Sequence, residues 1–376
     1  NFGVQIYYGG ENKFFGYDIG GGTNVGIIMT APNGETKFIS DDCKNFKNFD
    51  KNFLTKHSKI FIFIDNNVYS KHKKFIDLLN KINQKIHIKK IVSNEKAKNI
   101  INYPSYINFL SSYNCSKKDL IIGMGGGVVL DISGFVASTY MRKINLMLVP
   151  TNLIGMADAS TAGKTCLNTN SGKNLIGTFY LPKVVYNNIS FLETSNNVSF
   201  RQGFSEIFKY GLLSSNQLVQ LMIKYKANNS NALLKKILKL AIDKRFEIRK
   251  FNPLASNLGH TFGHAIEKMT DYKIKHGDAI SIGTIISLRF SLEKKLISQE
   301  LFDYIFKMMN YLDLKTSTKI KFNKIKWVNI MLKDKKSYDD NIGLILIRDI
   351  GFPVIKNKLP FYYVKKDEMI KFLDNI

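Results

Sequence analysis

Asp119-Leu120-Ile121-Ile122-Gly123-Met124-Gly125-Gly126-Gly127 decides the fold of the first half of the chain. Its apolar part predicts a buried β-strand, and the residues from about 128 predict a helix that begins directly after the glycines. Glycine at such a turn lets backbone N–H groups approach a pyrophosphate, and the helix dipole favours the anion. The run is not the G-x-G-x-x-G fingerprint, so a tight strand–helix turn without a ligand is an open alternative.

The sequence around this stretch alternates between strand and helix patterns. Strands are predicted at 59–64, 86–92 and 146–150, and helices at 68–84 and 95–113. Such alternation is typical of a mostly parallel sheet with helices on both faces. The sequence therefore predicts an α/β fold for this half of the chain.

Two acidic residues stand where sheets of this kind bind nucleotides. Asp65 ends the first strand, where it is placed to bind an adenosine hydroxyl. Asp131 lies four residues beyond Gly127. It either binds a ribose or a nicotinamide amide or only occupies the first helical turn.

After about residue 190 the pattern changes to long helices. Helices are predicted at 203–225, 231–250, 258–270 and 278–297. A strand pair is predicted at 343–348 and 351–355, and a last helix at 366–375. We therefore expect two domains, 1–190 and 191–376, the second mainly helical. Within the first 45 residues, turns are expected around 7–10 and 20–22.

Composition bounds the classes of function. The chain has 376 residues, is 44% hydrophobic and has no apolar run of membrane-spanning length, so we expect no membrane partner. No leader-like pattern opens it, and three scattered cysteines are typical of the reduced cytoplasm. The formal charge of +25 is spread along the chain, so we expect no nucleic-acid partner. Part of that charge can attract an anionic substrate.

Half of the six histidines fall between 260 and 276. On a helix His260 and His264 share a face, and His276 follows after a turn-like segment. Two of these imidazoles and one distant carboxylate would leave a zinc ion an open position. The alternative is that they are ordinary core or helix-surface residues, but the flanking Asn257-x-Gly259 and His276-Gly-Asp278 argue against it.

Residues 150–178 form a run of small and polar residues with two lysines, which predicts a phosphate-friendly loop. Within it, Gly163-Lys164-Thr165 looks like the end of a P-loop. The residue five positions before Gly163 is Asp158 rather than glycine, so we reject that motif.

From about Lys59 to its end, the chain resembles the 3-dehydroquinate synthase family of sugar-phosphate cyclases. Nine motifs occur in the family's order: Gly125-Gly-Gly-Val-Val-x-Asp131, Tyr140-Met-Arg142, Pro150-Thr151, Asp158-x5-Lys164-Thr165, Gly172-Lys-Asn-Leu-Ile-Gly177, Glu206-Ile-Phe-Lys-Tyr-Gly211, Asn257-Leu-Gly-His-Thr-Phe-Gly-His-Ala-Ile-Glu267, His276-Gly-Asp278 and Asp334-Lys-Lys336. The resemblance implies an NAD-binding α/β domain and a mainly helical metal- and substrate-binding domain.

The resemblance also implies roles for single residues. Glu206, His260 and His276 would hold the metal, normally zinc, with cobalt as a substitute. NAD would contact Asp65, Asn67, Glu95, Lys98, Gly126, Gly127, Val128, Asp131, Thr151, Asn152, Lys173 and Thr194. A sugar-phosphate substrate would meet Asp158, Lys164, Asn174, Lys209, Lys244, Asn257, His264 and one of Lys335 and Lys336, with Lys335 our first choice. Arg142 would reach a neighbouring subunit's site, which implies a homodimer.

The implied activity is a lyase reaction with catalytic NAD. A ring alcohol is oxidised, phosphate is eliminated, the ketone is reduced again, and the ring opens and closes as a carbocycle. Lys209 and Asp158 fit as groups that steer protons. Three of these residues or pairs have a purely structural alternative. Glu206 can be a surface carboxylate, Lys209 can be its ion-pair partner, and Lys335 and Lys336 can be ordinary surface lysines.

The chain departs from the family at several positions. Leu130, Asn152 and the small residues of 157–162 differ from the usual motif. Between Lys244 and Asn257 the segment is shorter, and the arginine that binds the substrate carboxylate in the family is replaced by Pro253 or deleted; Arg249 is a possible replacement. Loss of a bidentate partner would weaken carboxylate binding.

Three functions therefore stay open. The amino-acid sequence of the motif at 257–267 favours 3-dehydroquinate synthase. A cyclase that acts on glucose 6-phosphate (2-deoxy-scyllo-inosose synthase) or on sedoheptulose 7-phosphate would not need the arginine. An alcohol dehydrogenase of the glycerol-dehydrogenase kind is a more distant alternative.

Overall fold

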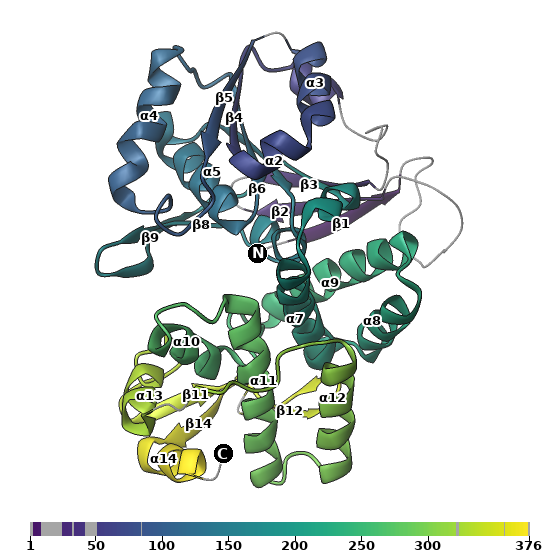
Figure 1. Cartoon of the computed structure of the whole chain (residues 1–376), viewed down its shortest axis with the longest axis vertical. Helices are drawn as coiled ribbons and strands as arrows, with labels where there is room; N and C mark the ends of the chain where they lie inside the picture. The colour runs from purple at the N-terminus through teal and green to yellow at the C-terminus, as the bar shows by residue number, and fades with distance from the viewer. Residues whose placement is uncertain are drawn as a thin grey trace. The chain divides into compact units, whose positions relative to one another are not determined.

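A computed structural model of the chain describes residues 3–8, 25–31, 34–41, 51–83, 85–320, 323–356 and 358–374. Of the turns expected around 7–10 and 20–22, Tyr7 and Tyr8 instead end strand β1 (Gly3–Tyr8), and residues 9–10 and 20–22 lie outside the described residues. The structure divides into two compact units, 1–196 and 197–376 (Figure 1). The division expected after residue 190 falls within a short 3-10 helix, η4 (Ile189–Thr194).

An eight-stranded sheet forms the centre of the first unit, with the strand order β1-β2-β3-β10-β7-β6-β4-β5. Three strands at one edge run antiparallel to one another: β1 (Gly3–Tyr8), β2 (Val25–Ala31) and β3 (Gly34–Asp41). From β3 onward all neighbours are parallel: β10 (Val184–Asn188), β7 (Asn145–Pro150), β6 (Leu120–Gly125), β4 (Ile60–Asp65) and β5 (Ile86–Ile91). The predicted mostly parallel sheet is confirmed.

The central strands β4 and β6 consist largely of consecutive apolar residues, because both faces of the sheet are buried at these strands. Residues 60–64 of β4 and all of β6 are buried. The helices of this unit are α1 (Lys51–Thr55), α2 (Asn66–Lys71), α3 (Lys73–Ile82), α4 (Tyr103–Ser112) and α5 (Gly127–Thr139), with the short α6 (Leu153–Ala157).

Three predicted elements of this unit differ from the structure. The helix expected over 68–84 is two helices, α2 and α3, separated at His72. The helix expected from 95 begins only at Tyr103, since Pro104 occupies its first turn, where a missing N–H does no harm. The loop expected within 150–178 contains an antiparallel hairpin, β8 (Lys164–Thr169) and β9 (Gly172–Phe179).

The second unit is mainly helical, as predicted. Its helices are α7 (Asn197–Ser214), α8 (Asn216–Asn228), α9 (Asn231–Phe251), α10 (His260–Met269), α11 (His276–Glu293), α12 (Gln299–Tyr311), α13 (Lys324–Met331) and α14 (Lys366–Asp374). The single helix expected over 203–225 is α7 and α8, because the Ser215 side chain caps a new helix by accepting from Leu218 N–H.

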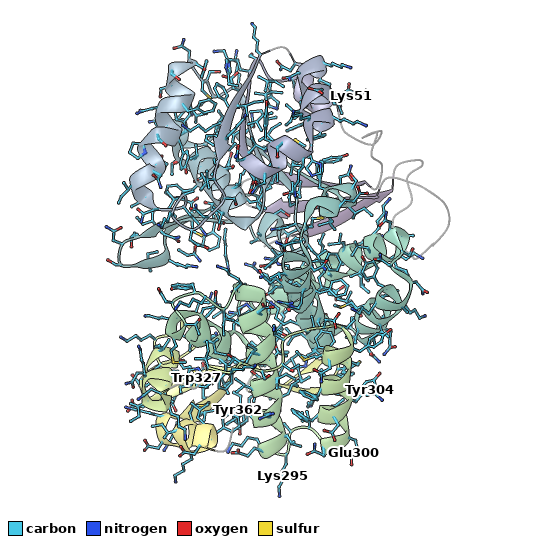
Figure 2. All side chains as sticks on the ribbon, in the orientation of Figure 1. Lys51, Lys295, Glu300, Tyr304, Trp327 and Tyr362 are labelled. Atoms are coloured by element: carbon cyan, nitrogen blue, oxygen red, sulfur yellow. The ribbon has the colours of Figure 1, made fainter. Side chains whose placement is uncertain are left out.

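The strand pair expected near residue 350 is only partly present. β12 (Ile347–Asp349) pairs with β13 (Phe352–Pro353), but β11 (Asn341–Leu344) pairs with β14 (Tyr362–Lys365). Strands β11 and β14 and the helices α10, α11, α13 and α14 enclose an apolar core that includes Phe262, Phe290 and Trp327. The Trp327 ring meets Phe262 edge-on, and Tyr362 meets Phe290 in the same way. Figure 2 labels Trp327 and Tyr362 in the second unit. This core holds α10 and α11 in place.

Among the described residues, no helix combines the length and the apolar character that crossing a membrane would require.

Candidate active site

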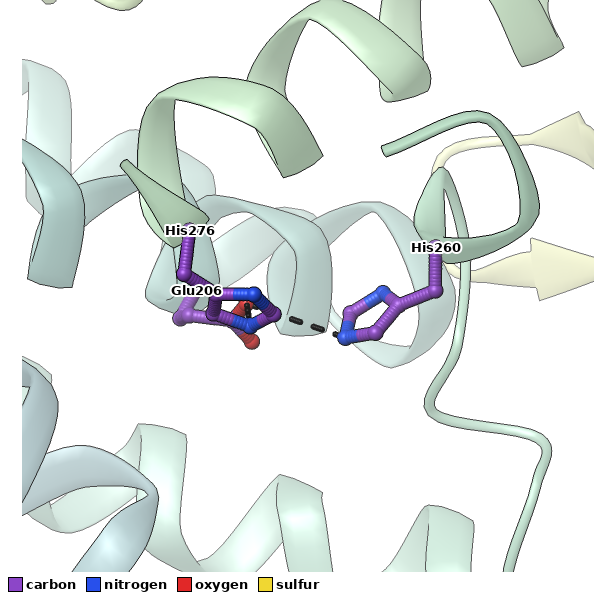
Figure 3. A group of neighbouring side chains, drawn as sticks. All are labelled: Glu206, His260 and His276. Carbon is purple, nitrogen blue, oxygen red and sulfur yellow. Dashed lines mark ion pairs between the residues drawn. The ribbon is translucent and has the colours of Figure 1, made fainter. Parts of the chain in front are cut away.

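One carboxylate and two imidazoles converge in the second unit. Glu206 Oε1 lies 3.4 Å from His276 Nε2 and 3.8 Å from His260 Nε2 (Figure 3). Glu206 is 1% exposed although it is charged, which is rare unless a partner or a metal compensates the burial. The structure therefore brings together the three metal ligands that the resemblance implied.

Three helices position these side chains. Glu206 stands in the middle of α7, whereas His260 and His276 are the first residues of α10 and α11. Gly259, before His260, has a φ of +75°, and a Cβ there would lie 2.5 Å from Thr284 Oγ1. Glycine is thus required where α10 begins, directly beside a ligand.

Each histidine is oriented through its second ring nitrogen. His260 Nδ1 lies 3.1 Å from the Leu258 carbonyl oxygen, and His276 Nδ1 lies 3.1 Å from Glu267 Oε2. A partner of this kind fixes the tautomer and turns Nε2 toward the shared position. Glu267 was not assigned a role from sequence, although it lies seven residues after His260, on the same face of a helix.

The electrostatics of the cluster favour a cation. Burial, with Lys209 and the other two histidines, holds the pKa of His260 well below its usual value, so its ring is neutral. The pKa of His276 is raised to about 10: burial opposes this shift, and Glu267 and Glu206 outweigh burial. Glu206 and Glu267 thus create a negative potential at this position, and the neutral His260 ring has a lone pair for a cation.

The donor set fits a zinc ion. One ligand atom each from Glu206, His260 and His276 lies within 4.8 Å of the others. Two nitrogens and one carboxylate oxygen suit zinc and leave a fourth position for a substrate oxygen. Lys209, three residues after Glu206 on α7, is ion-paired with Glu206 Oε2 and is 2% exposed. Lys209 is therefore the ion-pair partner of Glu206, as one of the two interpretations of the sequence predicted.

A second group of possible ligands overlaps the first. His264, Glu267 and His276 also bring three ligand atoms within 4.8 Å. His264 Nδ1 lies 3.3 Å from Asp334 Oδ2, and Asp334 is ion-paired with the buried Lys336. Of the two predicted lysines, Lys336 joins this network, and Lys335 is exposed. Asp334 belongs to the Asp334-Lys-Lys336 motif, but it was assigned no role of its own from the sequence.

Two further predicted substrate residues lie around α9. Lys244 donates to Glu247 Oε2 at 2.7 Å. Asn257 lies in the turn before α10 and accepts from His260 N–H through its backbone carbonyl at 3.1 Å. Helix α9 ends at Phe251, so Arg249 lies in its last turn and Pro253 follows it.

In the first unit, the predicted phosphate turn lies at a switch in strand order. β5 is on one side of β4, and β6, β7 and β10 extend to the other side. Ligands of open α/β sheets bind beyond the carboxyl ends of strands at such a point. Here these ends are Asp65 and Gly125, and α5 begins at Gly127. A Cβ on Gly126 would lie 2.7 Å from Asn152 Nδ2, so the turn has no room for a side chain.

Asp65 itself caps a helix. Its Oδ1 accepts from Asn67 N–H at 2.7 Å and from Val68 N–H at 3.4 Å. Asn152, after β7 and Thr151, is also a cap, with Oδ1 accepting from Gly155 N–H at 2.8 Å. Asp65 and Asn152 therefore lie close to the strand ends, as expected. Their side-chain oxygens accept hydrogen bonds from the first turns of the helices that follow.

The predicted cofactor and substrate residues Lys98, Asp131 and Asn174 form one network. Lys98 is 5% exposed, is ion-paired with Asp131 and donates to Asn174 Oδ1 at 2.6 Å. Cys166 Sγ lies 3.1 Å from Asn174 Oδ1 and 3.5 Å from Asp131 Oδ2. Cys166 was overlooked in the sequence because an isolated cysteine gives no signal.

A neighbouring set surrounds Glu95. Its Oε2 accepts from Asn168 Nδ2 at 2.7 Å, and its Oε1 lies 3.3 Å from Lys173 Nζ. Asn168 Oδ1 in turn accepts from Asn174 N–H at 2.9 Å, which links this set to Lys98. The hairpin β8–β9 supplies Asn168, Lys173 and Asn174, so the segment predicted to be a polar loop is an ordered ribbon.

Four further predicted residues are located by the elements that carry them. Val128 follows Gly127 in α5, Thr194 ends η4, and Asp158 separates α6 from the 3-10 turn η3 (Ala159–Thr161). Lys164 is exposed at the start of β8.

Arg142 stands on an unusual turn after α5. Met141, Arg142 and Lys143 all have positive φ values, of 45°, 60° and 109°, and all three are exposed. Left-handed backbone at non-glycine residues costs about 1 kcal/mol or more each, so this turn is held against a local preference.

Comparison with solved structures shows which proteins share this fold. A 2-deoxy-scyllo-inosose synthase complexed with carbaglucose-6-phosphate, NAD+ and Co2+ has a TM-score of 0.81 at 21% identity, covering 91% of this chain and 97% of that chain. A 2-epi-5-epi-valiolone synthase from Streptomyces hygroscopicus with NAD+ and Zn2+ bound has a TM-score of 0.79 at 22% identity, covering 90% and 95%. An iron-containing alcohol dehydrogenase from Thermotoga maritima reaches 0.59 at 16% identity, covering 90% and 96%.

The fold is thus that of the cyclases and of the iron-containing alcohol dehydrogenases. Sequence decides between them. The family model of the 3-dehydroquinate synthase N-terminal domain matches residues 88–202, and that of the C-terminal domain matches 203–337. The 3-dehydroquinate synthase of Endomicrobium trichonymphae is 32% identical over 80% of this chain and 84% of its own length, and that of Pelagibacter ubique 35% over 70% and 76%. The chain belongs to the 3-dehydroquinate synthase family.

Proposed function

We propose that the protein is a 3-dehydroquinate synthase of the shikimate pathway. It would convert 3-deoxy-arabino-heptulosonate 7-phosphate to 3-dehydroquinate and phosphate, and would act as a lyase with catalytic NAD. The observation that carries the proposal is the convergence of Glu206, His260 and His276 in a chain of this family. Three residues up to 70 positions apart form a zinc-type donor set, which a plain structural role does not require.

Glu206, His260 and His276 would hold zinc, or cobalt as a substitute. When bound, the metal would lower the pKa of a substrate hydroxyl and polarise the derived carbonyl. Leu258 and Glu267 hold the two rings so that their Nε2 atoms face Glu206. Lys209 lies on the opposite oxygen of Glu206, where it can retain a proton close to the substrate position.

NAD would bind at the strand ends of the first unit. Its chemistry there is to accept a hydride from the substrate and to return it. The turn at Gly126 and Gly127 offers backbone N–H groups to the pyrophosphate. Asp65, Asn67, Thr151 and Asn152 border that turn, and Lys98 with Asp131 forms a buried charged pair near it.

The substrate phosphate requires fixed cationic and amide donors. Lys164, Asn174, Lys244, Asn257 and His264 are our candidates, as the resemblance implied. Of Lys335 and Lys336, we favour Lys336 as the substrate-binding lysine. Lys336 is ion-paired with Asp334, and Asp334 also contacts the candidate substrate residue His264. Arg142, presented on an exposed turn with positive φ, would complete the site of a second subunit in a homodimer.

A second candidate function rests on the segment after α9. By the resemblance, the carboxylate-binding arginine of the family is replaced by Pro253 or deleted in this chain, so a sugar phosphate without a carboxylate is the alternative substrate. An alcohol dehydrogenase activity is disfavoured because the family models match the cyclase sequence across 88–337.

The test incubates the purified protein with NAD and zinc and one of three substrates: 3-deoxy-arabino-heptulosonate 7-phosphate, glucose 6-phosphate or sedoheptulose 7-phosphate. We expect phosphate release with the first substrate only, without net accumulation of NADH. Release with one of the others would reassign the substrate. Net NADH without phosphate would indicate a dehydrogenase, and no phosphate with any of the three would refute the cyclase.

A further inference from the structure

Two helices that carry metal ligands are joined by a bidentate ion pair. Arg201 Nε donates to Asp278 Oδ1 and Arg201 Nη2 donates to Asp278 Oδ2, both at 2.9 Å. The two side chains are 22% and 12% exposed, so water screens them only in part. The hydrogen bonds that Arg201 donates to Asp278 raise the pKa of the guanidinium. Two parallel bonds to a planar group restrict rotation as well as distance.

The pair lies close to the ligands along both helices. Arg201 is five residues before Glu206 on α7, and Asp278 is two residues after His276 on α11. Any sliding of α11 along α7 that moves Asp278 away from Arg201 therefore moves His276 away from Glu206. The geometry of the ion pair and that of the ligand pair are mechanically linked.

A backbone contact beside the pair sets how closely the helices approach. A Cβ on Gly277 would lie 2.5 Å from Gln202 Cα and 2.6 Å from Gln202 Cβ. α11 thus meets α7 with its bare backbone between His276 and Asp278. The contact at Gly277 limits the approach, and the ion pair limits lateral displacement.

The spacing that results is close to that of a bound ion. Zinc–ligand bonds of about 2.0–2.1 Å in a tetrahedron place donor atoms roughly 3.3 Å apart. Glu206 Oε1 and His276 Nε2 are 3.4 Å apart. A displacement of about 1 Å would therefore remove one ligand from its position, a tolerance that designed sites also show.

We propose that Arg201 and Asp278 are positioning residues that hold α7 and α11 in the register required for tight metal binding. The inference rests on the metal site proposed above. It assigns a function to two residues, 77 positions apart, that lie outside the ligand set.

The experiment measures zinc affinity of the metal-stripped full-length protein against a chromogenic chelator. The variants are Arg201→Lys, Arg201→Met, Asp278→Asn and the double variant Arg201→Met/Asp278→Asn. Arg201→Met and Asp278→Asn should each weaken zinc binding by about tenfold or more, as for other outer partners of metal ligands. Arg201→Lys, which keeps the charge and loses the fork, should fall between. The double variant should be no worse than the more affected single variant, because both remove one interaction.

Lys324→Met is the matched control, since it breaks the exposed Lys324–Asp374 pair in the same unit. Its zinc affinity should equal that of the unchanged protein. A purely structural role for Arg201 predicts a different pattern: urea unfolding of the zinc-free protein shifts, while zinc affinity and the visible spectrum of the Co2+-loaded protein do not change.

The outcomes separate the two proposals. If the unchanged protein binds no zinc, or His276→Ala binds it equally well, the metal site is wrong. If that site is sound and folded Arg201→Lys and Asp278→Asn bind zinc as tightly as the unchanged protein, the positioning role is wrong. These milder variants decide the matter should Arg201→Met fail to fold.

Discussion

Glu267 and His276 form a carboxylate–imidazole pair, with Glu267 Oε2 3.1 Å from His276 Nδ1. The other ring nitrogen of His276 faces Glu206, so Glu267 determines both the tautomer and the direction of a metal ligand. This relationship extends the site beyond the three residues that its motifs suggest.

Replacing Glu267 with glutamine should weaken zinc binding by about tenfold, within the range for such outer partners. The amide keeps a hydrogen-bond acceptor but loses the negative charge that makes the imidazole a stronger donor. Competition with a chelator measures the effect. Glu300→Gln, on the exposed first turn of α12, should bind zinc normally. Equal affinity in Glu267→Gln would show that the pair has no influence on the metal.

The two overlapping groups of possible ligands make opposite predictions. His260→Ala should abolish tight zinc binding, whereas His264→Ala should keep it and lose turnover. The reason is the distance from Glu206: His260 Nε2 lies 3.8 Å from Oε1, while His264 is engaged with Asp334. Zinc content after dialysis, measured by atomic emission, distinguishes the cases. Zinc retained by His260→Ala and lost from His264→Ala would transfer the ion to His264, Glu267 and His276.

Much of this site could be predicted because its residues lie in local motifs. His260 and His276 start helices after recognisable turns, and β4 and β6 are continuous apolar runs because both of their faces are buried. Contacts between distant residues to which the motifs give no role could not be predicted. Arg201 and Asp278 are 77 positions apart, and nothing local in the sequence marks them as partners.

Other differences have local causes that the hydrophobic pattern hides. The apolar periodicity continues through His72 and Ser215, where the helices break. At Ser215 the new helix depends on one polar side chain that caps it. The hairpin of 164–179 is polar because its second strand is largely exposed, so it lacked the apolar signal of a strand. Likewise, only folding shows that Lys336 is buried and its neighbour Lys335 is not.

Gly259→Ala should destabilise the protein and weaken the metal site. The residue has a φ of +75°, and a Cβ would lie 2.5 Å from Thr284 Oγ1 and 2.6 Å from Thr284 N. Left-handed strain and the clash together should cost about 2–4 kcal/mol. Urea unfolding measures the change. Gly127→Ala, whose Cβ would meet only Ala159 Cβ at 3.9 Å, should unfold like the unchanged protein. Similar midpoints for both variants would contradict this account.

Cys166 should be alkylated slowly at neutral pH. Burial and the neighbouring Asp131 raise the pKa of its thiol to about 11, and only the thiolate reacts. Iodoacetamide at pH 7.5 should modify it roughly a hundredfold more slowly than a free cysteine peptide, as its thiolate fraction requires. Site-resolved mass spectrometry follows the reaction. Asp131→Asn should accelerate it, and Asp77→Asn, on the exposed face of α3, should not. A rate equal to that of the peptide would refute the assigned environment.

Asp243, on α9, should make stability depend on pH between about 4 and 6. Burial raises its pKa to about 6, with Glu247 adding to the rise and Lys239 and Lys244 opposing it. Its Oδ1 is buried without a hydrogen-bond partner. The folded protein therefore binds this proton more tightly than the unfolded chain, whose value is near 3.8. The stabilisation from this difference is complete below pH 4 and disappears as the pH rises through 6.

Asp243→Asn removes the titrating group, so above pH 6 the variant should exceed the unchanged protein in stability by about 1–3 kcal/mol. Below pH 4 the two should converge, because the carboxyl is then neutral in both the folded and the unfolded state. Urea midpoints at pH 4, 5.5 and 7.5 measure this difference. Asp77→Asn, at an exposed position, should follow the unchanged protein at every pH. An Asp243→Asn advantage that is the same at all three values would mean that the effect is packing rather than charge.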